Sequence, residues 1–186
     1  MKKPLLLTFF ILVLAGCGSS VPGVTFPQVM NPKAAVFVEE FSDLQCPACA
    51  FISPVVTEIV RRNPGIIKLA FYHFPLSYHP FAFIAAEAAE CAADQGKFWE
   101  FMDTVYKNQS SLNEDFLYSV ADQLGLNAGS FKTCMETRAK KTVVQMGFQE
   151  GRDRQIPGTP TLFVNGKRVQ WAGEEAFEGY VKGLAE

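Results

Sequence analysis

Two cysteines three residues apart, Cys46 and Cys49, stand in the segment "FSDLQCPACA" at residues 41–50. Such a C-x-x-C pair can exchange electrons by making and breaking a disulfide, or can supply two thiolate ligands to a metal. A structural zinc site needs four ligands, commonly from a second C-x-x-C or two closely spaced histidines. The other cysteines stand alone, and His73 and His79 are six residues apart. We therefore expect redox chemistry, with no metal and no cofactor.

The residues around the pair predict the setting that a reactive thiol needs. The apolar run Ala34 to Phe41 is typical of a buried strand, and Ala50 to Asn63 has apolar residues at helical spacing. Pro47 suits the first helical turn, which places Cys46 at the helix N-terminus. Unpaired N–H groups and the helix dipole favour an anion there and lower the pKa of the thiol. We predict that Cys46 is the nucleophile and that Cys49 resolves the mixed disulfide.

Further strands follow from pattern and turn chemistry. Gly65 to Leu76 predicts a second strand. Near the C-terminus, "TLFV" and "KRV" predict two strands joined at Asn165-Gly166, a strong hairpin signal, and Pro160 stands directly before the first of them. The apolar face of the helix after the cysteines is expected to comprise Phe51, Val55, Val56, Ile59 and Val60.

Three segments, "FSDLQCPAC", "YHFPL" and "GTPTLFVNGK", together make the chain resemble the DsbA-like branch of the thioredoxin superfamily. The resemblance implies an α/β thioredoxin fold with an inserted all-helical domain, and exchange between protein thiols and disulfides. It also implies that the Thr159–Pro160 peptide bond is cis and lies against the C-x-x-C. A client strand can pair with the backbone of Thr159 in such a loop.

The expected domain organisation combines this resemblance with the helical patterns. Residues 33–76 and 155–186 are expected to form the thioredoxin-like domain, and residues 77–154 the helical insertion. Asn113 is a plausible cap for one of the inserted helices. The helical segments of the insertion are expected at 81–96, 97–109, 114–126 and within 134–154.

Residues 1–16 have the pattern of a signal peptide. Two lysines precede the apolar run Leu5 to Ala15, which is too short to span a bilayer as a helix. The run ends in "LAGC", which resembles the bacterial lipoprotein box and implies cleavage before Cys17 and acylation of that cysteine. A plain secretory signal is the alternative. Residues 17–32 are expected to be a tether, so that the protein is held outside the cytoplasm on a bacterial membrane, at the periplasmic side or the cell surface.

Two further cysteines, Cys91 and Cys134, both fall in the helical insertion. Because disulfides persist outside the cytosol, we predict a structural bridge between them. Closing a loop of this length contributes on the order of 4 kcal/mol in the chain-entropy model. Two buried free thiols are the alternative.

Polar residues near the pair are candidates for tuning its chemistry. Glu39 and Glu40 precede it on the predicted strand, where alternation puts them on opposite faces. A carboxylate that points inward would shift the pKa values of the thiols and could relay a proton to Cys49. The resemblance assigns this role to Glu40, whereas two solvated carboxylates are the alternative. Three further polar residues are expected to be structural: Asp43, His73 and His79.

The direction of exchange depends in part on the two residues between the cysteines, Pro47 and Ala48. Strong oxidants of the family usually carry histidine just before the second cysteine, whereas this chain has Ala48. We therefore expect a less stabilised thiolate and a milder potential. Oxidation of client thiols is slightly favoured, because the chain resembles the DsbA-like plan and shows no separate dimerisation domain. A disulfide reductase or isomerase of the same fold is the alternative, and a non-catalytic lipoprotein chaperone or scaffold is a further one.

The composition bounds the partners. A formal net charge of -2 makes no case for nucleic-acid binding. The expected partners are client proteins with thiols or disulfides, a membrane redox partner that recycles the protein, and the membrane itself through the lipid anchor. We expect the protein to be a monomer.

Overall fold

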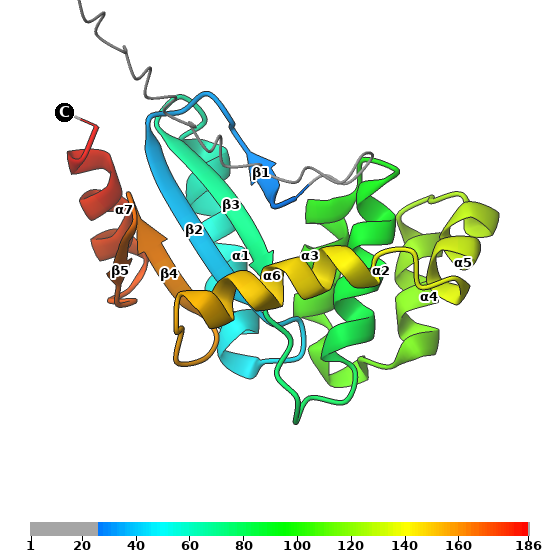
Figure 1. Cartoon of the computed structure of the whole chain (residues 1–186). Coiled ribbons are helices and arrows are strands. Elements are labelled where there is room, and N and C mark those ends of the chain that lie inside the picture. Colours follow the sequence, from blue (N-terminus) through cyan, green and yellow to red (C-terminus); the bar gives the residue numbers. More distant parts are fainter. Residues whose placement is uncertain (1–25, 186) are drawn as a thin grey trace, which may run out of the picture.

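The computed structural model describes residues 26–185, which form a five-stranded sheet with helices on both faces (Figure 1). The strand order is β1-β3-β2-β4-β5, and the central pair β2 and β3 is parallel. The other three pairings are antiparallel. The elements are β1 (Gln28–Met30), β2 (Val36–Ser42), α1 (Pro47–Arg62), β3 (Ile67–His73), α2 (Ala82–Ala93), α3 (Phe98–Lys107), the 3-10 turn Gln109–Ser111, α4 (Glu114–Gln123), α5 (Ala128–Glu136), α6 (Lys141–Asp153), β4 (Thr161–Val164), β5 (Lys167–Val169) and α7 (Glu174–Gly183).

The two central strands are buried on both faces, as their near-continuous apolar sequences require. In Figure 1, α6 crosses in front of the sheet and α1 lies behind it. On the α1 side, Val38 packs with Ile59 of α1 and Phe177 of α7. On the opposite side, Phe41 packs with Tyr72, and their rings stack with centroids 4.6 Å apart. Alternate residues of β2 therefore face two different environments.

The inserted segment α2–α6 separates the strands of the thioredoxin-like sheet in sequence, and its helices α2–α5 gather beside the sheet (Figure 1). Phe101 of α3 and Phe131 of α5 are fully buried between these helices. The same apolar cluster includes Cys46 and Cys49 of the C-x-x-C segment. The core of the insertion is therefore continuous with the surroundings of the two thiols.

Helix α6 approaches the sheet closely because it carries glycine where it meets β3. A Cβ on Gly147 would lie 2.6 Å from the carbonyl oxygen of His73, and one on Gly151 would lie 2.5 Å from the Phe74 ring. Cβ contacts of that length are too short for either position to carry a larger residue without a shift of the helix. The two glycines thus allow α6 to lie against β3.

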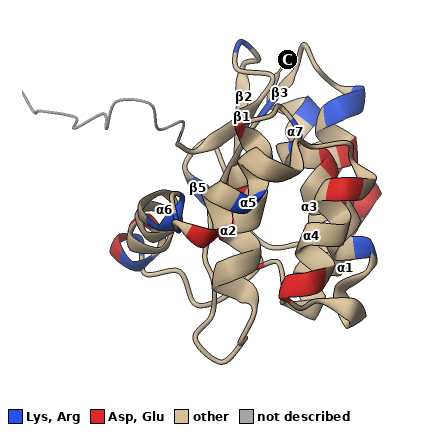
Figure 2. Ribbon diagram, turned by 90° about the vertical axis from the view of Figure 1, so that its right-hand side faces the viewer, with Lys and Arg blue, Asp and Glu red and all other residues tan. Residues whose placement is uncertain are grey.

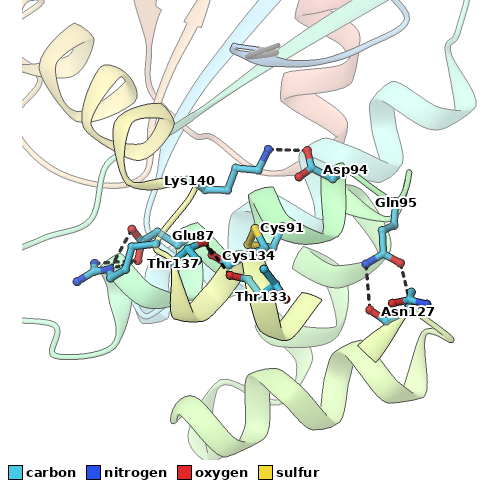
Figure 3. Close-up of a disulfide and its surroundings, with 10 residues drawn as sticks. Glu87, Cys91, Asp94, Gln95, Asn127, Thr133, Cys134, Thr137 and Lys140 are labelled. Atoms are coloured by element: carbon cyan, nitrogen blue, oxygen red, sulfur yellow. Dashed lines mark hydrogen bonds and ion pairs between the residues drawn. A yellow bond between two sulfur atoms is a disulfide. The ribbon is translucent and has the colours of Figure 1, made fainter. Parts of the chain in front are cut away.

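A disulfide joins Cys91 of α2 to Cys134 of α5, with their Cα atoms 5.9 Å apart (Figure 3). Polar contacts support the same junction. The side chain of Gln95 accepts a hydrogen bond from the backbone N–H of Asn127 at 2.7 Å, and Lys140 forms an ion pair with Asp94. The bridge therefore lies within a set of contacts that holds α2 against the later helices of the insertion.

Acidic and basic residues lie side by side on several helices, as in the view of Figure 2 along α6 and beside α3. At the C-terminal end of α1, Arg61 binds Asp103 of α3 at 2.7 Å and Arg62 binds Glu174 of α7 at 2.9 Å. These ion pairs link α1 to its neighbours on both sides.

The predicted hairpin is confirmed. Asn165 and Gly166 join β4 to β5, and both have positive φ, 48° and 76°. The predicted N-cap is confirmed as well, since the side chain of Asn113 accepts a hydrogen bond from the backbone N–H of Phe116 at 2.8 Å. The sequence therefore predicted both the hairpin turn and the helix cap correctly.

The tether predicted over residues 17–32 is wrong at its C-terminal end. Gln28–Met30 form β1, which pairs antiparallel with β3. The short strand is held in part by a hydrogen bond that Gln28 donates to Glu90 of α2 at 2.7 Å. A contact between residues so far apart in the chain cannot be recognised from sequence pattern. The predicted signal peptide and Cys17 lie outside the described residues. Within residues 26–185, no helix is long and apolar enough to cross a membrane.

Candidate active site

Cys46 occupies the N-cap position of α1, with Pro47 in the first turn, as the sequence predicts. Its thiol donates a hydrogen bond to the carbonyl oxygen of Thr159 at 3.4 Å. The Thr159–Pro160 peptide bond is cis, as the resemblance implies. The loop before β4 therefore lies directly against the first cysteine, although 113 residues separate Thr159 from Cys46.

The structure favours the thiolate form of Cys46. The pKa of this thiol is lowered to about 5, chiefly by a hydrogen bond from the Cys49 thiol, with help from the side chain of Thr159 and from the backbone N–H groups of Cys49 and Ala48. Burial opposes this shift. The first helical turn thus supplies a set of donors around one sulfur atom, which is what a helix N-terminus offers an anion.

Cys49 has the opposite character. Its side chain is fully buried. Burial raises the pKa of its thiol well above the usual value, and the hydrogen bond that it donates to Cys46 raises it further. One cysteine of the pair is therefore primed to attack, while the other retains its proton until a base removes it.

The loop before α1 is held by hydrogen bonds to the insertion. Gln109 donates hydrogen bonds to the carbonyl oxygens of Leu44 at 2.9 Å and Cys46 at 3.0 Å. The side chain of Gln45 accepts a hydrogen bond from the backbone N–H of Phe81 at 2.7 Å. These contacts orient the backbone on which the reactive thiol is presented.

Asp43 and His79 extend this support, and their predicted structural character is confirmed. One carboxylate oxygen of Asp43 accepts a hydrogen bond from the backbone N–H of Gln45 at 2.7 Å. The other oxygen accepts from the N–H of Leu76 at 2.8 Å and lies 2.8 Å from Nδ1 of His79. His73 is likewise buried and hydrogen-bonded, since its Nε2 lies 3.1 Å from a carboxylate oxygen of Glu90.

Glu40 is completely buried on the side of β2 that faces α1. Burial raises the pKa of its carboxyl from 4.5 to about 7, although hydrogen bonds from Ser53 and Ser42 oppose the shift. The hydroxyl of Ser53 donates to Oε1, whereas Oε2 is buried and finds no hydrogen-bond partner among the described residues. A carboxyl in this setting can hold or release a proton near neutral pH.

Glu39 is also buried, on the opposite side of the strand. Arg154 binds its carboxylate at 2.8 Å, and the hydroxyl of Tyr72 lies 3.4 Å away. Opposite faces for Glu39 and Glu40 are confirmed by these partners, and the alternative of two solvated carboxylates is wrong. Strand alternation alone cannot show that a helix covers each face.

The helix face beside Cys46 is exposed and apolar. Pro47 and Ala48 are exposed, and Phe51, one turn further on the same side, is 72% exposed. Tyr78, whose ring packs against His79 of the supporting loop, is 73% exposed. The sequence groups Phe51 with the apolar face of this helix, but in the structure Phe51 is exposed whereas Ile59 and Val60 of that face are buried.

Sequence reasoning missed four residues of this site. Ser42 and Ser53 lie on elements that were predicted, and a signal existed for each: Ser42 is two residues after Glu40 on the strand, and Ser53 is four after Cys49 on the helix. The other two, Tyr106 and Gln109, come from the insertion, and no sequence signal could have found them.

The chain belongs to the thioredoxin family. A family model described as thioredoxin matches residues 28–182, nearly the whole of the described chain. The fold and the C-x-x-C at the start of α1 define the class, a thioredoxin-fold protein with a paired-cysteine site.

Solved structures share this fold, with its inserted helices. The thiol-disulfide exchange protein alpha-DsbA2 from Wolbachia pipientis is 19% identical, with a TM-score of 0.75 over 85% of this chain and 87% of that one. BdbD from Bacillus subtilis is 20% identical, with a TM-score of 0.72 over 84% of this chain and 91% of that one. The architecture is thus a mixed α/β thioredoxin-like sheet carrying the inserted segment α2–α6.

Curated relatives match over most of this chain but over little of their own length. The chain is 36% identical over 142 residues to the Na(+)/H(+) antiporter NhaA 1 of Salinispora arenicola. That alignment covers 75% of this chain and 22% of the antiporter. The chain therefore spans about a fifth of the length of the curated relatives that it matches.

Proposed function

We propose that the protein is a thiol–disulfide oxidoreductase that exchanges disulfides with client proteins through Cys46 and Cys49. The observation that carries this proposal is the asymmetry of the pair at the N-terminus of α1. The Cys46 thiol has a pKa lowered to about 5 beside the Thr159 carbonyl, whereas Cys49 is fully buried and its thiol pKa is raised. Such a pair supplies one nucleophile or leaving group and one resolving thiol.

In the oxidising direction, a client thiolate attacks the Cys46 sulfur of the Cys46–Cys49 disulfide. The S–S bond between the two cysteines breaks, a mixed disulfide with the client forms, and Cys49 leaves as a thiolate that takes up a proton. A second client thiolate then attacks the client sulfur and releases Cys46 as its stabilised thiolate. The client loses two electrons and the enzyme gains them; reduction of a client disulfide is the reverse sequence.

Oxidation is the direction that the thiolate stabilisation favours. A stabilised Cys46 thiolate stabilises the reduced enzyme, which makes its disulfide more oxidising. A pKa of about 5 lies between the values of about 7 for thioredoxin and about 3.5 for DsbA. We therefore expect a potential between about -270 mV and about -120 mV, milder than that of DsbA, in line with Ala48 in place of histidine.

Clients are bound as extended, unfolded segments in this proposal. The backbone of Thr159 pairs with the client strand, and apolar client side chains pack on Phe51 beside Pro47 and Ala48. The exposure of Phe51 and Tyr78 supports this arrangement, because large aromatic side chains at a reactive site are typical of binding surfaces. Pairing through the backbone suits many different clients.

The first experiment traps the client intermediate and measures the potential of the Cys46–Cys49 couple against glutathione. Cys49→Ala should accumulate mixed disulfides through Cys46, whereas Cys46→Ser should form none and lose all turnover. A reduced two-cysteine peptide should be oxidised by the wild-type protein. Absence of any trapped client, together with unchanged function of Cys46→Ser, would instead support a non-catalytic chaperone or scaffold. A potential near that of thioredoxin would favour a reductase.

The protein acts outside the cytoplasm, anchored by acyl chains on Cys17, with a membrane redox partner that restores its disulfide. The lipoprotein-like "LAGC" at residues 14–17 supports the anchor, and several acyl chains at about 0.8 kcal/mol per buried CH₂ would hold it stably. Labelled fatty acid should enter the wild-type protein and be absent from Cys17→Ala. Equal labelling of both would contradict the anchor.

A further inference from the structure

A chain of buried hydroxyl groups runs from Glu40 toward Cys49. The Ser53 hydroxyl of α1 donates to Oε1 of Glu40, and its oxygen lies 2.9 Å from the hydroxyl oxygen of Ser42. A hydrogen bond from the Ser42 side chain also lowers the pKa of the Cys49 thiol, against the larger effect of burial, so the hydroxyl is within reach of that sulfur. Both serines are almost completely buried, at 0% and 1% exposure. The carboxyl and the resolving thiol are thus linked without passing through the surface.

The insertion adds a further hydroxyl group to this chain of hydrogen bonds. The phenol oxygen of Tyr106 of α3 lies 2.9 Å from the hydroxyl oxygen of Ser42. Tyr106 is 4% exposed, and burial raises the pKa of its phenol well above the usual value, with the charges of Cys49 and Glu40 raising it further. The phenol therefore retains its proton, and its hydroxyl can donate a hydrogen bond to Ser42.

We propose that Ser53 and Ser42 carry the proton between Glu40 and Cys49, and that Tyr106 is a positioning residue that keeps Ser42 aligned for this transfer. The inference rests on the proposed role of Cys49 as the resolving thiol. It extends that role by naming the path of the proton, to which an element of the inserted domain contributes.

The hydrogen bonds of this chain can run in two directions, and the proton balance follows. With Cys49 as a thiol, Ser42 donates to Ser53 and Ser53 donates to the Glu40 carboxylate. When Cys49 attacks the mixed disulfide at Cys46, its proton passes to the Ser42 oxygen, the Ser42 proton to Ser53, and the Ser53 proton to Oε1 of Glu40. The new Cys46–Cys49 S–S bond forms as the client thiolate leaves. In the opposite direction the chain returns the proton to the Cys49 thiolate.

Glu40 is the group that accepts and releases the proton at one end of this chain of hydroxyl groups. The titratable side chains that share its cluster are Cys49 of α1 and Tyr106 of α3. Its carboxyl, with a pKa near neutrality and one oxygen that no group of residues 26–185 binds, is suited to both protonation states. Two other buried carboxylates near this region have partners of their own: Glu39 binds Arg154, and Asp43 binds His79.

The test isolates the resolving step in the full chain with 5,5′-dithiobis(2-nitrobenzoate). Its first phase forms a mixed disulfide at Cys46, and its second phase, attack by Cys49, releases a second coloured thiolate. The second phase of the wild-type protein should accelerate as the pH rises and level off above about 7, where Glu40 is ionised. Ser53→Ala and Ser42→Ala should slow this phase on the order of 10- to 100-fold at pH 7 and abolish the levelling.

Four comparisons make the result specific. The double variant Ser42→Ala/Ser53→Ala should be no slower than either single variant, because a chain broken once no longer conducts. Tyr106→Phe should slow the second phase less and keep the levelling. Thr57→Val, which removes a buried hydroxyl one turn after Ser53, is the matched control and should behave as the wild type. Ser53→Thr, which keeps the hydroxyl, should restore the pH profile.

The possible failures are distinct. Wild-type rates and pH profile in both serine variants, or slowing that multiplies in the double variant, would overturn the relay. A slowed first phase in the serine variants would mean general damage to the site and would equally overturn it. If the wild-type protein showed no second phase, Cys49 would not be the resolving thiol and the proposed function itself would fail.

Discussion

Glu39 and Glu40 are neighbours in sequence and equally hidden from solvent, yet the two sides of β2 treat them differently. Glu39 faces α6 and binds Arg154, so its charge is compensated. Glu40 faces α1, its hydrogen-bond partners among residues 26–185 are hydroxyl groups, and burial raises the pKa of its carboxyl to about 7. A buried carboxylate with a cation stabilises an interface, whereas one without a cation becomes an acid and base near neutral pH.

The difference assigns separate tasks to the two faces of one strand. On the α6 side, Arg154 also binds Glu150 of α6 at 2.7 Å and lies over the Phe41 ring at 5.4 Å, so the ion pair ties the end of the insertion to the sheet. On the α1 side, no cation of the described part of the chain pairs with Glu40, which leaves its proton available to the cysteine pair. Three substitutions test this comparison.

Removing the cation should have the largest effect on stability. Arg154→Met leaves the Glu39 carboxylate buried without its partner, and we expect the free energy of unfolding to fall by about 3 kcal/mol at pH 7. Arg152→Met, at an exposed position two residues earlier, is the matched control and should change it little. Denaturant unfolding checks both. Equal stability of the two variants would show that Glu39 does not depend on Arg154.

Neutralising Glu40 should act in the opposite direction. Because its folded pKa of about 7 exceeds the ordinary 4.5, its contribution to stability is fully present below pH 4.5 and is lost as the pH rises through 7. Glu40→Gln should therefore stabilise the protein by on the order of 2 kcal/mol at pH 8 and by little at pH 4. Unfolding is measured in a Cys46→Ala/Cys49→Ala background, with exposed Glu58→Gln as control. A loss of stability at pH 8 would contradict the unpaired state of Glu40.

Neutralising Glu39 should have the smallest effect. Arg154 keeps Glu150 and is partly exposed, so Glu39→Gln should cost about 1 kcal/mol at pH 7. The cost of Glu39→Gln and Arg154→Met together should be less than the sum of the single costs, because both remove the same pair. Additive costs in a double-mutant cycle would show that the two side chains act independently.

Much of the fold could be read from local patterns. The strand before Cys46, the helix after it and the Asn165-Gly166 hairpin follow from apolar spacing and turn chemistry, which depend on neighbouring residues alone. β1 and the exposure of Phe51 could not be predicted in this way. Each depends on which distant element lies opposite, such as Glu90 of α2 for β1.

The candidate site divides in the same manner. The sequence by itself determined the cysteine pair, its place at the start of a helix, and the opposite faces of Glu39 and Glu40, because spacing along a strand or helix sets these relations. Only the tertiary structure decided that Arg154 meets Glu39 while Ser53 and Ser42 meet Glu40, and that Tyr106 and Gln109 reach the site from the insertion. Except for Ser42 and Glu40, which are two residues apart, these contacts join residues distant in the chain, and burial by packed elements, rather than residue type, raises the pKa of Glu40 to about 7.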